Sequence, residues 1–142
     1  RFSLTNNCQG CLIMKSEKKF LIVGGGSMGR RRVRCLQAFA VAAENILVFD
    51  VRLDRRQECE RRHGVRTVSS FAEGMAWNPD VVVVSLPTKY HVEICLAAAK
   101  AGKDIWCEIA LSHQMNDVAE LMKVVAQKKL IFGIGLNNPF HY

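Results

Sequence analysis

The amino-acid sequence predicts an α/β protein: a doubly wound parallel sheet of about six strands, with helices on both of its faces. Three observations lead to this fold class. Short apolar runs rich in β-branched residues alternate with stretches whose apolar residues have helical spacing. Neither a long loop nor an internal repeat interrupts this alternation between residues 18 and 142. A glycine-rich turn directly follows the first apolar run, where a buried strand is expected to lead into a helix.

The apolar runs are the predicted strands. The strongest of them, DVVVVSLP, contains four consecutive valines, which is typical of a central parallel strand buried on both faces. The six predicted strands are residues 20–23, 46–49, 65–68, 80–87, 104–107 and 130–136.

Helical spacing and end signals predict the connecting helices. Gly64 and Gly102 stand where a left-handed residue commonly ends a helix. Ser70 and Glu73 have the spacing of a capping box, so a brief helix is expected to begin there. The other predicted helices are residues 28–42, 53–63, 88–101 and 114–128.

Composition bounds the class of protein. The 142 residues suffice for one domain with a single core, and no apolar run approaches the roughly 20 residues that a membrane span needs. Residues 1–17 are expected to be an N-terminal extension, non-native or disordered, with Met14 resembling a natural start. The apolar stretch 11–14 is too short for a signal peptide, so a cytoplasmic location is expected.

The cysteines agree with that location. Four of the six lie inside apolar periodic segments, where a free cysteine behaves as a small core residue. These four are Cys35, Cys59, Cys95 and Cys107. Cys8 and Cys11 form a lone C-x-x-C without a second pair, so no metal site is assigned.

Positive charge is concentrated in one part of the chain. The net charge is +7, and residues 30–66 hold ten arginines against five acidic residues. Such a region can bind nucleic acid, and this remains one functional alternative. Because no aromatic residues are interleaved with the arginines, a solvated or anion-facing surface is favoured instead.

The sequence GGGSMG, which starts at Gly24, fits G-x-G-x-x-G in the strand-to-helix setting of a Rossmann dinucleotide-binding fold. Gly24 would permit the tight turn, Gly26 the approach of backbone N–H groups to a pyrophosphate, and Gly29 close packing of the helix. Ser27 and Met28 begin that helix, whose N-terminal donors favour phosphate. We predict dinucleotide binding here; the alternative is a purely structural turn.

Asp50 ends the second strand, about 20 residues after the glycine turn. A carboxylate there can accept hydrogen bonds from an adenosine ribose and repels a 2′-phosphate, which indicates NAD. Arg52 and Arg55 favour NADP instead, unless they are only solvated surface. We expect NAD, with NADP as the alternative. Of the arginines at 30, 31, 32 and 34, at most two are expected to contact phosphate, and the rest to be surface charge.

From residue 18 onward the chain resembles the N-terminal domain of the glucose–fructose oxidoreductase and inositol dehydrogenase family (Gfo/Idh/MocA). The similarity lies in FLIVGGGSMGRRRV, VFD, DVVVVSLPTKYHVEICLAAAKAGKDIWCE and IFGIGLNNPF. It implies a nicotinamide-dependent oxidoreductase acting on sugars, polyols or related cyclic substrates. It also implies that Leu86, Pro87 and Thr88 form a wall beside the cofactor and that His91 stands near its nicotinamide half. Glu108 matches the Glu of the family's Glu-Lys-Pro motif.

Each of these residues also has a purely structural alternative, as a strand end, a first-turn helix residue or a loop carboxylate. The chain departs from the family where Ile109-Ala110 replaces Lys-Pro. The resemblance implies that this Lys helps to orient the substrate and its reacting hydroxyl, so no catalytic residue is assigned. Asn137-Asn138-Pro139 likewise replaces a motif that usually holds arginines.

The family's second domain, which carries the substrate pocket, is absent from the predicted elements. We therefore expect an NAD(P)-binding domain of an oxidoreductase that is incomplete as a catalyst alone. The expected partners are a dinucleotide, with a second copy of the chain or a complementary substrate-domain subunit. The alternatives are a non-catalytic nucleotide-binding module and, third, a basic nucleic-acid-binding Rossmann protein.

Overall fold

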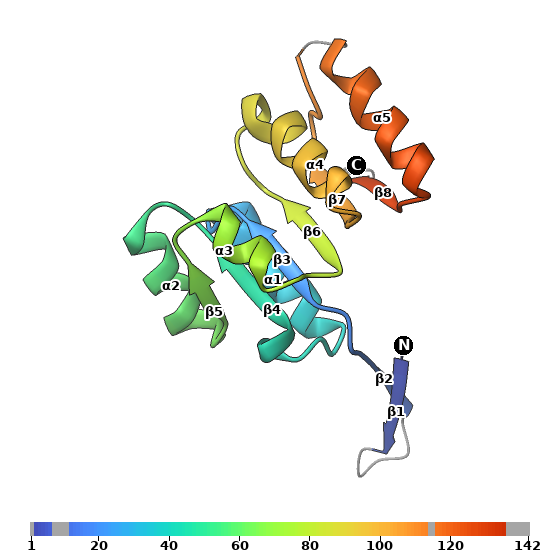
Figure 1. Ribbon diagram of the computed structural model, residues 1–142. Helices are drawn as coiled ribbons and strands as arrows, with labels where there is room; N and C mark the ends of the chain where they lie inside the picture. Colours follow the sequence, from blue (N-terminus) through green and yellow to red (C-terminus); the bar gives the residue numbers. More distant parts are fainter. Residues whose placement is uncertain (1, 7–11, 114–115, 136–142) are drawn as a thin grey trace, which may run out of the picture.

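The computed structural model describes residues 2–6, 12–113 and 116–135 (Figure 1). Its centre is a six-stranded sheet in the order β5-β4-β3-β6-β7-β8, in which all neighbouring strands are parallel. The strands are β3 (Phe20–Val23), β4 (Ile46–Phe49), β5 (Arg66–Val68), β6 (Val81–Val84), β7 (Asp104–Glu108) and β8 (Phe132–Gly135). The direction of winding reverses between β3 and β6, which makes this a doubly wound sheet, as predicted.

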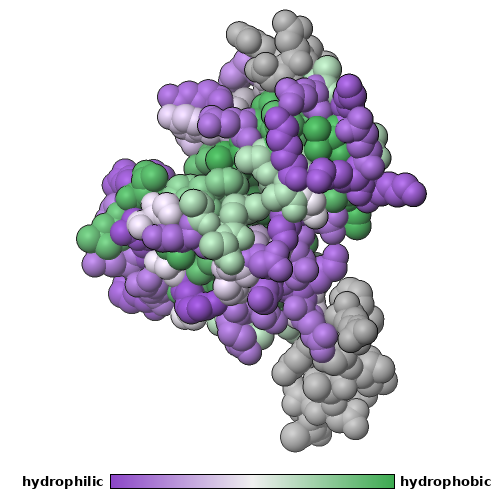
Figure 2. Space-filling model, in the orientation of Figure 1, coloured by the Kyte–Doolittle hydropathy of each residue, from purple (hydrophilic) through white to green (hydrophobic). Residues whose placement is uncertain are grey.

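Helices cover both faces of the sheet (Figure 1). They are α1 (Ser27–Ala38), α2 (Leu53–His63), α3 (Phe71–Ala76), α4 (His91–Lys100) and α5 (Asn116–Lys128), with short 3-10 turns at Ala43–Asn45 and Thr88–Tyr90. Within the described residues, no helix is long and apolar enough to cross a bilayer. Figure 2 shows a band of hydrophobic side chains across the middle of one face of the molecule, flanked by hydrophilic ones.

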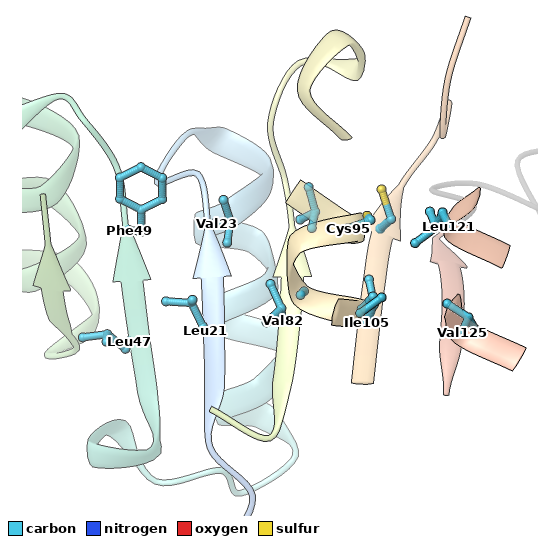
Figure 3. Close-up of a cluster of buried hydrophobic side chains, with 13 residues drawn as sticks. Leu21, Val23, Leu47, Phe49, Val82, Cys95, Ile105, Leu121 and Val125 are labelled. Carbon is cyan, nitrogen blue, oxygen red and sulfur yellow. The ribbon is translucent and has the colours of Figure 1, made fainter. Parts of the chain in front are cut away.

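Two hydrophobic clusters lie on opposite sides of the sheet. Successive residues of a strand alternate between them: Ile22 faces the cluster under α1 and α2, and Leu21 faces the cluster under α4 and α5. Figure 3 shows the second cluster, in which Leu121 and Val125 of α5 pack over the β7–β8 side of the sheet. Burial on both faces explains why the strands are continuously apolar.

Most predicted elements are confirmed, and the differences have local causes. β6 ends at Val84 rather than at Pro87, which has no N–H to donate to the sheet. Residues 88–90 then form a 3-10 turn, so α4 begins at His91. α1 ends at Ala38, because Ala40 adopts a left-handed conformation (φ 59°) and Val41 N–H bonds back to the Leu36 carbonyl.

Three predicted helix ends are present. Gly64 and Gly102 have positive φ angles of 64° and 74°. Ser70 Oγ accepts a hydrogen bond from the Glu73 N–H at 3.2 Å. The returning bond of the capping box differs from the prediction, since Glu73 Oε2 accepts from the N–H of Ser69.

The N-terminal extension contains two strands that the sequence analysis does not predict. β1 (Phe2–Asn6) and β2 (Leu12–Ser16) pair antiparallel in a separate two-stranded sheet (Figure 1). A two-stranded ribbon depends mainly on its own ladder of hydrogen bonds, so it leaves little hydrophobic pattern in a sequence.

Candidate functional site

The residues predicted for a site gather at one edge of the sheet. The carboxyl ends of β3, β4, β6 and β7 lead directly into the glycine turn, Asp50, Ser85 and the loop after Glu108. β3 and β6 are also the strands between which the winding reverses. In open α/β sheets this crevice is the usual position of a ligand.

The glycine turn is packed against backbone at two positions and open at a third. Gly24 has φ +108°, and a Cβ added to it would lie 2.5 Å from the Ser85 carbonyl oxygen. A Cβ on Gly29 would overlap the carbonyl oxygen of Gly24, so α1 approaches β3 as closely as predicted. At Gly26 the added Cβ would meet only Arg55 Nη1, at 3.8 Å. The open surface therefore lies at Gly26.

Gly26 is also the N-cap of α1. No side chain caps this helix end, and no acidic residue lies in its first turn, which begins with Ser27 and Met28. The first N–H groups of a helix have no partner within the helix. Together with the helix dipole, these donors favour an anion beside the turn.

Asp50 is buried, with 4% of its surface exposed, and its carboxylate is hydrogen-bonded to the glycine turn. Its Oδ2 accepts the N–H of Gly25 at 2.8 Å, and its Oδ1 accepts the N–H of Arg52 at 2.9 Å. Arg55 Nη1 lies 3.5 Å from Oδ2. The carboxylate thus ties the glycine turn to the end of β4, which the sequence analysis did not anticipate.

The two arginines after Asp50 lie differently. The Arg52 guanidinium binds Asp54 through two hydrogen bonds of 3.0 and 2.6 Å, which raise the pKa of Arg52 and lower that of Asp54. Arg55 stands between Asp50 and Gly26. Arg55 is therefore the arginine that the fold places at the phosphate turn.

A cavity of about 490 Å³ opens beside Asp50 and reaches the end of β6. It is lined by Phe49, Asp50, Val51, Arg52, Arg55, Leu86, Pro87, Tyr90, Glu93 and Ile94. Its size and apolar walls suit a flat ring system. Thr88 lines a different cavity, of about 500 Å³, with Lys89, Val92, Glu93, Leu96, Ser112, His113 and Glu120. The predicted wall of Leu86, Pro87 and Thr88 is thus divided between two cavities.

Glu108 is buried at the end of β7 and paired with Arg32 of α1. Its Oε1 accepts a hydrogen bond from Arg32 Nε at 2.5 Å, which raises the pKa of Arg32. Arg32 also stacks over the Trp106 ring, 5.4 Å from its centroid. Arg32 therefore departs from the expected division of these arginines into phosphate contacts and surface charge: it lies three residues after Gly29, on the side of α1 that faces the sheet. Glu108 Oε2 is buried without a hydrogen-bond partner among the described residues.

His91 lies below this edge, only 1% exposed. Its Nε2 is 2.6 Å from the Leu86 carbonyl oxygen, and its Nδ1 is 2.8 Å from that of Ala110. Both ring nitrogens are therefore engaged with backbone, and the side chain is not open to a ligand. Asn137-Asn138-Pro139, the other departure from the family pattern, lies outside the described residues.

Three supporting residues carry no signal in the sequence. Arg30 Nη1 donates to the Gly25 carbonyl at 3.1 Å and pairs with Glu58 at 3.0 Å. The buried thiol of Cys59 lies 3.8 Å from the same carbonyl. Ser85, whose carbonyl packs on Gly24, has a buried Oγ with no partner among the described residues.

Three observations fit a dinucleotide. Gly26 leaves a cradle that a side chain would fill, the N-terminus of α1 has no side-chain cap, and Glu108 Oε2 is buried with no donor in the described part of the chain. These groups can hold a pyrophosphate and accept hydrogen bonds from ribose hydroxyls. Ile109, next to Glu108, offers no group that takes or gives a proton.

Comparison with known proteins agrees with this geometry. The Gfo/Idh/MocA family profile, described as an oxidoreductase family with an NAD-binding Rossmann fold, matches residues 18–136. The chain is 32% identical to inositol 2-dehydrogenase 3 of Saccharopolyspora erythraea over 104 residues, which cover 72% of this chain and 30% of that protein. It is also 32% identical to myo-inositol 2-dehydrogenase of Thermotoga maritima, covering 66% of this chain and 28% of the relative.

A solved structure matches as well. The crystal structure of myo-inositol 2-dehydrogenase from Lactobacillus plantarum superposes with a TM-score of 0.76 at 25% identity, over 84% of this chain and 36% of that one. The chain thus spans about a third of the length of the relatives that it matches. It belongs to the Gfo/Idh/MocA oxidoreductase family, and it corresponds to the NAD-binding Rossmann domain of that family.

Proposed function

We propose that this chain binds NAD along the carboxyl edge of its sheet, as the cofactor domain of a dehydrogenase of sugars or polyols. The open cradle at Gly26 carries the proposal, because backbone donors and the start of α1 meet there, and an added Cβ would come no closer to another side chain than 3.8 Å, at Arg55 Nη1. In this assignment the pyrophosphate lies on the turn, Asp50 accepts from the adenosine ribose, and the cavity beside Leu86 and Pro87 receives the adenine.

Glu108 would accept a hydrogen bond from a ribose hydroxyl on the nicotinamide half of the cofactor. Oε2, which has no hydrogen-bond partner within residues 2–6, 12–113 and 116–135, supports this role, since a buried acceptor without a donor is costly unless a ligand supplies one. Arg32 keeps the carboxylate oriented through Oε1. NAD supplies the hydride chemistry when it is bound, whereas the residues of this chain bind and orient it.

Preference for NAD over NADP is supported by the charges beside the adenosine position. Asp50 is buried and would repel a 2′-phosphate, and the Arg52 guanidinium is engaged by Asp54. Arg55 remains as the cation that can favour NADP, although it is already close to Asp50. The balance therefore favours NAD.

The substrate class is proposed from the family and from the inositol dehydrogenases among the relatives. The group that orients the substrate would come from a further segment, a second copy or a complementary subunit, because Ile109 replaces the motif Lys. A cytoplasmic location is supported by the free thiols of Cys35, Cys59, Cys95 and Cys107.

The nucleic-acid alternative is less well supported. Five arginines of the basic region are paired with carboxylates, so much of its positive charge is compensated locally. These are Arg30, Arg32, Arg52, Arg55 and Arg62.

Calorimetric titration with NAD tests the cofactor assignment. Gly26→Val would place a branched side chain in the cradle, and we expect the affinity for NAD to fall at least tenfold, about 1.4 kcal/mol. Ala97→Val adds a similar side chain at an exposed position of α4, and its affinity should equal that of the parent. Equal affinities of a folded Gly26→Val variant and the parent would refute the phosphate position, with folding checked by circular dichroism.

A further inference from the structure

His91 connects two loops that are far apart in the sequence. It begins α4, which packs on β6 and β7 (Figure 1). Its ring lies between the loops that leave these two strands. Nε2 reaches the Leu86 carbonyl after β6, and Nδ1 reaches the Ala110 carbonyl after β7. Leu86 lines the proposed adenine cavity, and Ala110 lies two residues after Glu108.

Both partners of the ring are acceptors, which determines its charge. A carbonyl oxygen has no proton to donate, and a neutral imidazole has one N–H and one lone pair. In the neutral form one ring nitrogen would direct its lone pair at a carbonyl oxygen less than 3 Å away. The doubly protonated imidazolium donates to both carbonyls, so this geometry favours the cation.

The surrounding groups act in the same direction. Burial by itself lowers the pKa of His91, but the side chain of Cys107 and the Leu86 and Ala110 carbonyls outweigh it and raise the pKa from 6.5 to about 9. Cys107 of β7 is the titratable side chain that faces the ring. The pKa of Cys107 is lowered, first by a hydrogen bond with the free thiol of Cys95 in α4 and then by His91. The charge of Glu108 opposes this lowering.

We propose that His91 is a positioning residue of the cofactor edge: its imidazolium binds the loop after β6 to the loop after β7 and thereby sets the width of the site between them. This role rests on the proposed NAD function. His91 touches no cofactor in this assignment; it acts through the Leu86 and Ala110 carbonyls. A raised folded-state pKa means that the stabilisation is complete below pH 6.5 and is lost as the pH rises through about 9.

Binding of NAD across a pH series tests the role of His91. In His91→Gln both side-chain N–H groups share one nitrogen, which cannot occupy the positions of Nδ1 and Nε2 at once, so we expect about tenfold weaker NAD binding at pH 7.5. The ratio of the parent and variant affinities for NAD should approach one above pH 10, where the parent imidazole is neutral and donates to only one of the two carbonyls. The other titrating groups are the same in both proteins and cancel in the ratio, except Cys107, whose pKa His91 also lowers. His63→Gln, at the far end of α2, should bind NAD as the parent does.

Nitrogen NMR of the parent protein provides a measurement that does not depend on whether a variant folds. At pH 8 we expect both ring nitrogens of His91 to carry protons. His63, whose pKa is lowered by burial and by Arg34, Arg30 and Arg62, should show a single protonated nitrogen in the same spectrum.

The outcomes separate this inference from the proposed function. If the parent binds NAD but His91 is neutral at pH 8, or if folded His91→Gln binds NAD equally well at every pH, the positioning role is refuted and NAD binding stands. If the parent does not bind NAD, both proposals fail. A His91→Gln variant that does not fold leaves the NMR result to decide, since a neutral ring overturns the inference and a doubly protonated ring supports it.

Discussion

Side chains at the proposed cofactor edge are largely held by the protein itself. Asp50 fixes the Gly25 N–H, and Arg32 fixes the Glu108 carboxylate. Groups held in this way lose little freedom when a ligand arrives, so a larger part of the interaction energy appears as affinity. The edge is therefore organised before a cofactor binds.

Asp50 should control the choice between NAD and NADP. Asp50→Ala removes the charge that repels a 2′-phosphate and releases Arg55, so we expect the ratio of NAD to NADP affinity to fall about tenfold. Loss of the Gly25 N–H acceptor should weaken NAD binding as well. Titration with both dinucleotides measures the ratio. Glu44→Ala removes an equal charge at the opposite end of β4 and should leave the ratio unchanged.

The cofactor preference of the parent protein can contradict this assignment directly. A tenfold preference of the parent for NADP, about 1.4 kcal/mol, would show that Arg55 outweighs Asp50.

Residue types at the site could be predicted from the sequence, but their pairings could not. The glycine turn and Asp50 can be recognised in the sequence, because each occupies a fixed position at the end of a predicted strand. The Arg32–Glu108 pair joins residues 76 positions apart, and one residue among four nearby arginines gives no sign of facing inward. His91 was recognised by resemblance, yet its two carbonyl partners depend on backbone positions that no pattern encodes.

At the scale of elements, strong periodicity gave reliable predictions. β6 is four valines, and burial on both faces follows from that composition. The end of α1 could not be predicted, because the left-handed residue there is Ala40. A glycine at that position would have indicated a helix end, whereas an alanine does not. The strands β1 and β2 were missed because their pairing is local and only weakly patterned.

The contact between α1 and β3 should be intolerant of even one methyl group. Gly29→Ala would drive Cβ into the Gly24 carbonyl, so the helix must move away from the strand. We expect a loss of about 1–3 kcal/mol in the free energy of unfolding, measured by urea denaturation. Gly26→Ala is the matched control in the same turn, because its Cβ would meet only Arg55 at 3.8 Å. Equal stability of Gly29→Ala and Gly26→Ala would contradict this packing.

At the scale of the whole molecule, strand order places the site. The strand order β5-β4-β3-β6-β7-β8 brings the carboxyl ends of β3, β4, β6 and β7 to one edge of the sheet. The residues that follow these strands are far apart in the sequence, from position 24 to position 110. The sequence predicted this edge because alternation of strands and helices, together with right-handed crossovers, leaves few other topologies. At position 109, directly after β7, the chain has isoleucine, which offers no group to orient a substrate hydroxyl.

We expect the 142-residue polypeptide to bind NAD without oxidising polyols. Removal of hydride from an alcohol requires a group that takes the hydroxyl proton and a pocket that holds the carbon at reacting distance. Ile109 takes no proton, both nitrogens of His91 are occupied by carbonyls, and Glu108 is held by Arg32. Incubation with NAD and a panel of inositols and sugars should give NADH at the background rate, with an inositol 2-dehydrogenase as the positive control. Steady NADH production that disappears in Glu108→Ala would show instead that this carboxylate acts as the proton acceptor and that the chain catalyses on its own.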